Sequence, residues 1–130
     1  MRWTDLLNDP KTVIAVVGAT DSPGKYGGRI YRNLKGKGFT VYAVNPNRDS
    51  VDGDPAYPSL ESLPGRPDII DLVVPATQGT LVAGEAAELA LDQIWIQPGA
   101  EGRSLVTALD EAGLNYLVGR CIMVEAPHHH

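Results

Sequence analysis

The stretch TVIAVVG, residues 12–18, decides the fold of this 130-residue chain. It is short, continuously apolar and rich in β-branched residues, and it stops at a glycine. A strand without alternation of polar and apolar residues is typical of one that is buried on both faces, as the inner strands of parallel sheets are. The stretch therefore predicts a strand near the middle of an open α/β sheet, followed by a turn at Gly18.

Further apolar runs alternate with segments of helical spacing. Strands are predicted at 40–44, 69–74, 94–96 and 116–118, and helices at 4–7, 25–37, 80–91 and 103–112, with a short helix at 59–63 and either more strand or a separate element at 122–124. Parallel strands need crossovers of this kind, and the crossovers are right-handed. The pattern predicts one Rossmann-like, doubly wound α/β domain with a mostly parallel five-stranded sheet and helices on both faces.

Composition excludes several classes of function. The net charge is −5 and we find no cluster of Lys and Arg along any one face, which argues against a general nucleic-acid binder. No apolar run reaches the roughly 18 residues that a membrane span needs. A single cysteine gives no internal disulfide and no CxxC metal site, so we expect a cytoplasmic protein without a bound metal.

Neither end of the chain contains residues that we expect to take part in function. Residues 1–10 lack the basic start and apolar stretch of a signal peptide. The only three histidines are the last three residues, 128–130, and we interpret them as the remnant of a purification tag. The functional domain is accordingly expected to span residues 1–126, with 127–130 as the tag remnant.

The turn GATDSPGK, residues 18–25, is the first candidate site. Glycines let a backbone approach a ligand closely, and free amides at a helix start favour a phosphate. Thr20 and Ser22 add hydroxyl donors and Lys25 adds a cation. A P-loop is excluded, because five residues separate the two glycines and Tyr26 follows Lys25; GxGxxG is also absent. The turn is either a phosphate cradle or a plain connection between strand and helix.

The segment NPNR, residues 45–48, follows the second predicted strand. A site for NAD usually places an acidic residue there, to bind the ribose hydroxyls. This chain has no acid at that point and offers Arg48 instead. That cation suits a ligand with an additional phosphate on its ribose, such as NADP or coenzyme A, unless Arg48 is simply a solvated charge of the loop.

Taken together, these segments resemble the small stand-alone coenzyme A-binding proteins. Their domain is related to the N-terminal coenzyme A-binding domain of the succinyl-CoA synthetase α subunit. The resemblance extends from about Leu6 to Glu125. It rests on VVGAT at 16–20, SP at 22–23, KYG at 25–27, YAVNP at 42–46, YPSL at 57–60, IWIQPG at 94–99 and RCIMVE at 120–125. The segment VVPAT at 73–77 departs from the Phe-Arg pair common in the small proteins and is closer to the synthetase subunit.

The resemblance implies non-catalytic binding of coenzyme A or an acyl-CoA, with no prediction for protein partners. The turn at 20–23 and Arg48 would contact the nucleotide phosphates, residues 75–77 would line the adenine or pantetheine side, and residues 96–98 would border the pantetheine arm. The full set of expected binding residues is Gly18, Ala19, Thr20, Asp21, Ser22, Pro23, Lys25, Tyr26, Asn45, Pro46, Arg48, Pro75, Ala76, Thr77, Ile96, Gln97 and Pro98.

Catalysis is not expected. The synthetase reaction needs a phosphorylatable histidine in a second domain, and this chain offers neither. A Ser–His or Cys–His arrangement also needs a histidine that is not terminal. Two alternatives stay open: an NADP- or other nucleotide-binding domain with an oxidoreductase role, which the missing GxGxxG disfavours, and a structural subunit that binds nothing.

Cys121 and the aromatic residues allow two interpretations each. A lone cysteine beside an apolar strand is usually a small buried core residue. Alternatively, Cys121 lies near the thiol of the ligand and forms a mixed disulfide with it, with Arg120 stabilising the thiolate. Trp95 and Tyr42 are predicted to be core residues, whereas Tyr26 either covers a bound ligand or packs inward.

Overall fold

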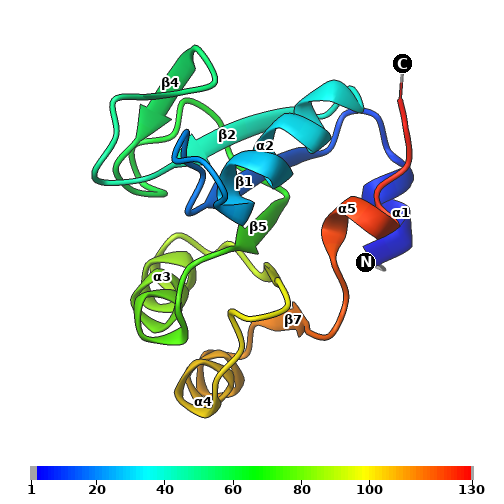
Figure 1. The fold of residues 1–130 in the computed structure, drawn as a ribbon. Coiled ribbons are helices and arrows are strands. Elements are labelled where there is room, and N and C mark those ends of the chain that lie inside the picture. The colour runs from blue at the N-terminus through cyan, green and yellow to red at the C-terminus, as the bar shows by residue number, and fades with distance from the viewer. Residues whose placement is uncertain (1–2, 130) are drawn as a thin grey trace.

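A computed structural model describes residues 3–129 of the chain (Figure 1). Its strands are β1 (Val13–Val17), β2 (Thr40–Val44), β3 (Ser50–Val51), β4 (Asp54–Tyr57), β5 (Ile69–Leu72), β6 (Gln93–Ile96) and β7 (Asn115–Leu117). Its helices are α1 (Trp3–Asn8), α2 (Tyr26–Gly36), α3 (Ala76–Glu88), α4 (Arg103–Ala112) and α5 (Ile122–Glu125). The longest, α3, has 13 residues, and none of the described helices is long and apolar enough to cross a membrane.

The sheet is mostly parallel and β1 lies at its centre. The strand order is β3-β4-β2-β1-β5-β6-β7, and only β3 runs antiparallel to its neighbour. Residues Ile14 to Val17 are all buried, because helices and loops cover both faces of β1. The predicted doubly wound α/β fold with a central first strand is therefore confirmed.

The predicted number of strands is wrong, since the sheet has seven strands rather than five. The two additional strands, β3 and β4, form a hairpin in the segment that follows β2. Asp52 and Gly53 lie at its tip with φ values of 53° and 80°. An Asp-Gly pair of this kind is a hairpin signal. A two-residue strand, however, is too short to show any alternation of side chains, so the sequence pattern indicated only a turn.

Two predicted helices also need correction. Residues 59–63 form a turn instead of a helix, and Ser59 does not cap one: its N–H donates to Ser62 Oγ at 3.2 Å. Helix α3 begins at Ala76 rather than at residue 80, and β5 ends at Leu72 rather than at residue 74. Pro75 stands at the boundary, where its fixed φ suits a helix start.

The two helices nearest the C-terminus are consistent with the sequence analysis. Helix α4 spans Arg103–Ala112 as predicted, and Gly113 ends it in the left-handed conformation with φ 71°. The segment at 122–124, for which two structures were possible, is part of the short helix α5.

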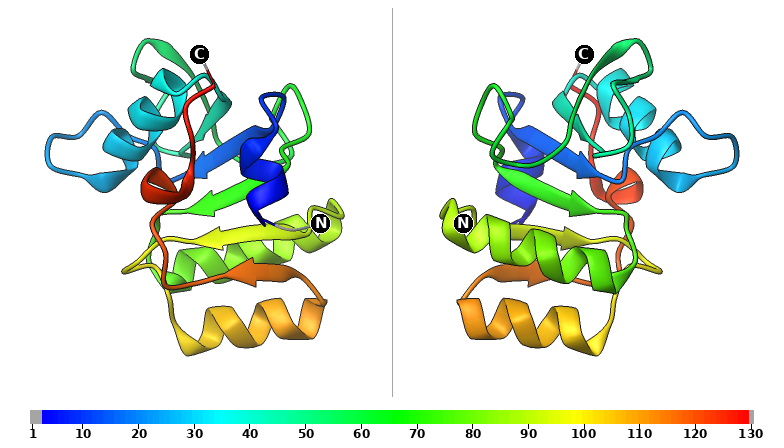
Figure 2. Two further views of the ribbon diagram at one scale, coloured as in Figure 1. Left: turned by 90° about the vertical axis from the view of Figure 1, so that its right-hand side faces the viewer. Right: turned by 90° about the vertical axis from the view of Figure 1, so that its left-hand side faces the viewer.

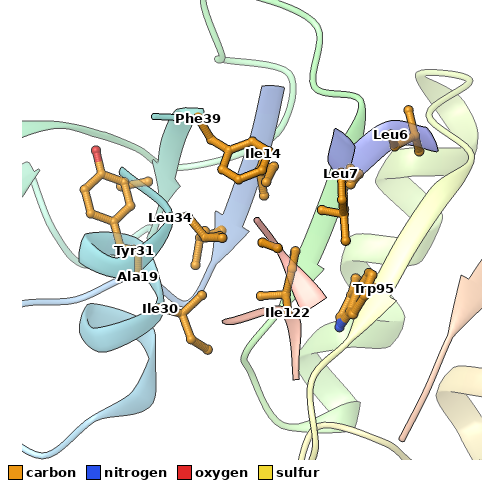
Figure 3. Packing of buried hydrophobic residues seen from close by; sticks show 14 of the residues in the cluster. Leu6, Leu7, Ile14, Ala19, Ile30, Tyr31, Leu34, Phe39, Trp95 and Ile122 are labelled. Atoms are coloured by element: carbon orange, nitrogen blue, oxygen red, sulfur yellow. The ribbon is translucent and has the colours of Figure 1, made fainter. Parts of the chain in front are cut away.

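Helices cover both faces of the sheet, as predicted (Figure 2). Helices α1, α2 and α5 pack on one face, where Leu7, Ile30, Leu34, Trp95 and Ile122 converge (Figure 3). Helices α3 and α4 pack on the other face, and their buried residues include Ala83, Ala86, Leu105 and Leu109. The central strands contribute alternate side chains to the two clusters.

His129 packs against the body of the domain. Its Nε2 lies 2.7 Å from the carbonyl oxygen of Leu7, and its ring meets Phe39 edge to face with centroids 4.9 Å apart. Its N–H donates to the carbonyl of Lys37. Residue 130 lies outside the described part of the chain, and the assignment of 127–130 as a tag remnant stays a prediction.

Two glycines at the start of α2 let the helix touch the turn after β1. A Cβ at Gly27 would lie 1.9 Å from the carbonyl oxygen of Gly18, and one at Gly28 would lie 2.3 Å from that of Thr20. Real Cβ atoms do not approach a carbonyl so closely. The helix and the turn are thus in backbone contact, and this contact fixes where the turn lies.

The carboxyl group of Asp71 is fully buried in the core. Asp71, on β5, is paired in register with Val16 and Trp95 and has no exposed surface. Neither of its carboxyl oxygens has a hydrogen-bond partner among residues 3–129. Burial raises the pKa of Asp71 well above its usual value, because the charged form would be desolvated. The carboxyl group therefore holds its proton far above the pH at which an exposed aspartate loses it.

We expect Gly27→Ala to lower the free energy of unfolding by about 2 kcal/mol or more, because the new methyl group meets backbone that cannot turn away. Gly36→Ala is the matched control in the same helix, since a Cβ there meets nothing within 4 Å. The control should be neutral or stabilising by up to about 1 kcal/mol. Urea denaturation measures both changes, and equal stability of the two variants would contradict the predicted contact.

The buried carboxyl group should make stability depend on pH. An aspartate in the unfolded chain titrates near pH 3.9, at about its ordinary pKa. The folded-state pKa is raised, so the contribution of Asp71 to stability is greatest below the unfolded value and declines as the pH rises toward the folded value. Asp71→Val should consequently raise the melting temperature, and the increase should be larger at pH 8 than at pH 4. Circular-dichroism melts of both proteins test this; an increase that is the same at both pH values would refute it.

Candidate functional site

The carboxyl ends of the central strands lie side by side at the C-terminal end of the sheet (Figure 2). Val17, the last residue of β1, pairs with Val44 of β2 on one side and Leu72 of β5 on the other. The chain then leaves β1 toward α2 and β5 toward α3, which lie on opposite faces. Such a divergence opens a crevice beyond the strand ends, and ligands of doubly wound folds bind there.

A cleft of about 520 Å³ occupies this crevice. Seven of the predicted binding residues line it: Gly18, Thr20, Ser22, Lys25, Asn45, Pro46 and Pro75. Its inner walls are mostly apolar and include Val17, Val44 and Val74, while hydroxyl, amide and ammonium groups stand around them. A flat apolar group with polar or anionic substituents fits this arrangement.

Hydrogen bonds hold the turn after β1 in place and join it to the loop after β2. Within the turn, Thr20 Oγ1 accepts the N–H of Ser22 at 3.2 Å. Asn45 Nδ2 donates to the carbonyl of Ala19 at 2.9 Å, and a guanidinium nitrogen of Arg48 donates to Ser22 Oγ at 2.5 Å. Arg48 does not line the cleft itself, but this bond places its positive charge beside the hydroxyl groups of the turn.

Asp21 and Pro23 belong to the same turn but do not line the cleft. The carboxylate of Asp21 accepts the N–H of Asp52 at 2.9 and 3.2 Å, so it ties the turn to the tip of the β3–β4 hairpin. Pro23 is exposed. Asp21 therefore helps to position the turn.

Four other predicted residues lie away from the cleft lining. Ala19 and Ile96 have no exposed surface and belong to the two core clusters. Ala76 and Thr77 open helix α3, where Thr77 is exposed and Ala76 packs partly against the core. Neither side chain lines the cleft, although the neighbouring Pro75 and Gln78 do.

A second, smaller hollow of about 120 Å³ lies on the α2 face, lined by Tyr26, Ile30, Val73, Gln97, Pro98 and Cys121. Val73 also lines the cleft, so the two hollows meet at this residue. Gln97 is almost fully buried: its Oε1 accepts the N–H of Ile122 at 2.8 Å, and its Nε2 lies 3.3 Å from Cys121 Sγ. The structure thus brings Tyr26, Gln97 and Pro98 together. Their role in binding the ligand stays a prediction.

Cys121 is partly exposed rather than a fully buried core residue. Its thiol faces the second hollow, together with the apolar side chains of Ile30 and Val73. The mixed disulfide with a ligand thiol stays a prediction.

The aromatic residues fall into two groups. Trp95 is 1% exposed and is a core residue as predicted, with its indole N–H donating to the carbonyl of Arg120 at 2.9 Å. Tyr42 is partly buried and meets Tyr57 edge to face. Tyr26 is 60% exposed and does not pack inward, and the guanidinium of Arg29 lies over its ring, 5.5 Å from the ring centre.

Sequence reasoning missed one wall of the cleft. Gln78, Leu81, Val82 and Glu85 of α3 face the cleft, opposite the loop at 58–60. The carboxylate of Glu85 accepts the N–H groups of Leu60 at 3.0 Å and Glu61 at 3.3 Å, which joins these two walls. The helix predicted at 80–91 includes Leu81, Val82 and Glu85 but not Gln78, and its apolar spacing indicated packing against the sheet rather than a wall of the cleft. Pro75, a typical helix start, was the available signal for Gln78.

No metal centre emerges from the part of the chain that the structure describes, because no three His, Cys, Asp or Glu side chains there are grouped to hold an ion. The chemistry of the cleft is instead that of hydrogen-bond donors. Thr20, Ser22, Lys25 and Arg48 can all donate to phosphate oxygens.

Comparison with known proteins agrees with this geometry. Residues 12–127 match the family described as the CoA binding domain. The α subunit of the ADP-forming acetate–CoA ligase II of Pyrococcus furiosus is 31% identical over 128 residues, covering 88% of this chain but only 28% of that protein. The uncharacterized protein YneT of Bacillus subtilis is 30% identical over 111 residues, covering 85% of this chain and 82% of that one.

Solved structures show the same likeness. A conserved hypothetical protein from Pyrococcus furiosus superimposes with a TM-score of 0.82 at 44% identity, covering 88% of this chain and 98% of that chain. Relatives therefore include both small proteins of similar length and much longer ligase subunits. The chain belongs to the family of CoA-binding domains.

Proposed function

We propose that this protein binds coenzyme A or an acyl-CoA in the cleft beyond β1 and β5, without transforming it. One observation carries the proposal: an apolar cleft at the strand ends, with the hydroxyl groups of Thr20 and Ser22, the ammonium of Lys25 and the guanidinium of Arg48 gathered at the turn beside it. Apolar walls suit the adenine ring, and the donors suit its phosphates.

The two hollows suggest how the ligand lies. Adenine would occupy the slot between Val44 and Val74, with the phosphates at the turn after β1. The pantetheine arm would then pass Val73 into the second hollow, so that the thiol lies near Gln97 and Cys121. Arg48 follows the second strand, where related folds place the residue that binds the ribose substituents. Arg48 would therefore bind the phosphate on the ribose.

The positions of the histidines support binding without catalysis. A nucleophile and a base within hydrogen-bond reach are the usual mark of covalent catalysis. The three histidines all stand at the C-terminus, and His129 contacts Phe39 and Leu7, next to the amino end of β2 and far along the strand from the cleft. The reactions of the ligase relatives belong to proteins of which this chain spans between 9% and 28%.

A panel of ligands tests the proposal by thermal shift. Coenzyme A and acetyl-CoA at a hundredfold their dissociation constants should stabilise by about 2.7 kcal/mol, a shift of roughly 10 °C for a domain of this size. NAD and ATP, which lack the additional phosphate on the 2′ or 3′ oxygen of the ribose, and NADP should shift the transition much less. A shift with NADP alone would favour the oxidoreductase alternative, and a flat panel would favour a subunit that binds nothing.

Replacing Arg48 tests the ribose phosphate directly. Arg48→Gln should weaken coenzyme A about tenfold, because a charge-assisted hydrogen bond is lost at a partly solvated site. Dephospho-coenzyme A lacks that phosphate, so its affinity should hardly change. Lys11→Gln is the matched control. It removes an exposed cation just before β1, at the amino end of the strand and away from the cleft at its carboxyl end. Isothermal titration calorimetry measures the affinities, and an equal loss for the two ligands would contradict this role for Arg48.

A further inference from the structure

A third hollow, of about 310 Å³, lies away from the cleft, between α1, the strands β6 and β7 and the ends of α5. It is lined by Trp3, Thr4, Leu7, Asn8, Trp95, Leu117, Arg120 and Glu125. In the left view of Figure 2, α1 (blue) and α5 (red) lie in front of the sheet, and none of the described helices covers β7 (orange) on this side. Among the described residues, none lines both this hollow and either the cleft or the second hollow. We name it the tryptophan hollow.

Two indole rings meet at the tryptophan hollow. The ring of Trp3 stands at 86° to that of Trp95, with the two centroids 5.5 Å apart. Trp95 is 1% exposed and its N–H is already bonded to the carbonyl of Arg120, so it offers an apolar ring surface. Leu7 of α1 and Leu117 of β7 add further apolar groups to the lining. Walls of aromatic and aliphatic side chains suit a flat or branched apolar group.

Opposite charges stand side by side at the same hollow. Arg120 Nη1 lies 2.6 Å from Glu125 Oε1, and the two side chains are 65% and 32% exposed. This bond uses one of the five N–H donors of the guanidinium and one of the two carboxylate oxygens. Both side chains thus keep capacity to bind a charged group. Because the pair has no net charge, a simple anion or cation is attracted by one partner and repelled by the other.

The volume of the tryptophan hollow limits its occupant to a small molecule. Liquid water takes about 30 Å³ per molecule, so the hollow has room for roughly ten waters, or for a ligand of about a dozen non-hydrogen atoms. Sites for small molecules begin at about 300 Å³ and combine apolar walls with a few polar groups that fix the orientation. Thr4 and Asn8 of α1 add a hydroxyl and an amide to the lining.

We infer that the tryptophan hollow binds a free α-amino acid with a large apolar side chain, such as phenylalanine. An α-amino acid carries its ammonium and its carboxylate on one carbon, so its two charges are as closely spaced as those of the Arg120–Glu125 pair. The carboxylate would bind Arg120 and the ammonium would bind Glu125, so that the four charges alternate in sign. The side chain would contact the two indole rings. The inference goes beyond the proposed function, because it uses none of the residues expected to bind coenzyme A.

Intrinsic fluorescence tests the site directly, because the chain has two tryptophans, Trp3 and Trp95, and both line the hollow. L-Phenylalanine should change the emission saturably, with a dissociation constant of about 0.1 to 1 mM, as expected of a ligand of this size. Phenylpropionate lacks the ammonium and phenethylamine lacks the carboxylate. Each should bind at least about tenfold more weakly, because one charge-assisted hydrogen bond is missing. Saturating coenzyme A should leave the affinity for phenylalanine unchanged.

A variant of Glu125 tests which charge it binds. Glu125→Gln should weaken phenylalanine about tenfold without weakening phenylpropionate, because only phenylalanine carries the ammonium. Glu111→Gln is the matched control, since it removes an exposed carboxylate from α4, on the other face of the sheet. Circular dichroism checks that each variant is folded. If Glu125→Gln does not fold, Arg120→Gln replaces it, and phenethylamine then becomes the ligand that should be insensitive.

Four results would overturn the inference. The first is the absence of a saturable change in emission with phenylalanine. The second is equal affinity of the wild type for phenylalanine and phenylpropionate, and the third is an equal loss of both ligands in Glu125→Gln. The fourth is competition between phenylalanine and coenzyme A, which would place the amino acid in the cleft. The first three leave the proposed function untouched, since titration with coenzyme A tests it separately.

Discussion

The parallel pairing of β1 with both β2 and β5 is the constraint on which the rest of the structure depends. Buried backbone groups must be hydrogen-bonded, and β1 satisfies this requirement through a neighbour on each side. Its apolar side chains in turn require cover on both faces, so the chain must send helices to opposite sides. The cleft arises where these two directions separate, at the aligned ends Val17, Val44 and Leu72. Fold and candidate site thus have a single origin.

The backbone contact between α2 and the turn after β1 fixes the position of the candidate site relative to the sheet. Gly27 and Gly28 let the helix lie directly against Gly18 and Thr20. The same contact fixes the hydroxyl groups of the turn and the start of the helix relative to one another. The donors of the turn are therefore held in place before any ligand binds, which lowers the cost of ordering them.

The sequence predicted what depends on long or strongly patterned segments. The run at 12–17 identified the central strand because burial on both faces leaves no polar position in it. The turn at 18–25 could be placed beside the cleft because loops after parallel strands share an edge. Shorter features could not be predicted from the sequence. Strand β3, for example, has two residues and shows no periodicity. Gln78 could join the α3 wall of the cleft only because α3 begins at Ala76, and the contact of Glu85 with Leu60 depends on how the helix packs against a distant loop.

The hairpin that added two strands also has a consequence for the behaviour of the protein at high concentration. A sheet edge offers unpaired backbone groups to other chains, and short or charged edge strands discourage such pairing. One edge here is β3, with two residues, and the other is β7, with three. Beside β3, the ammonium of Lys35 lies 2.7 Å from the carboxylate of Asp54 and 3.2 Å from that of Asp52. The open sheet thus ends, at both margins, in strands too short to recruit a further chain and begin aggregation.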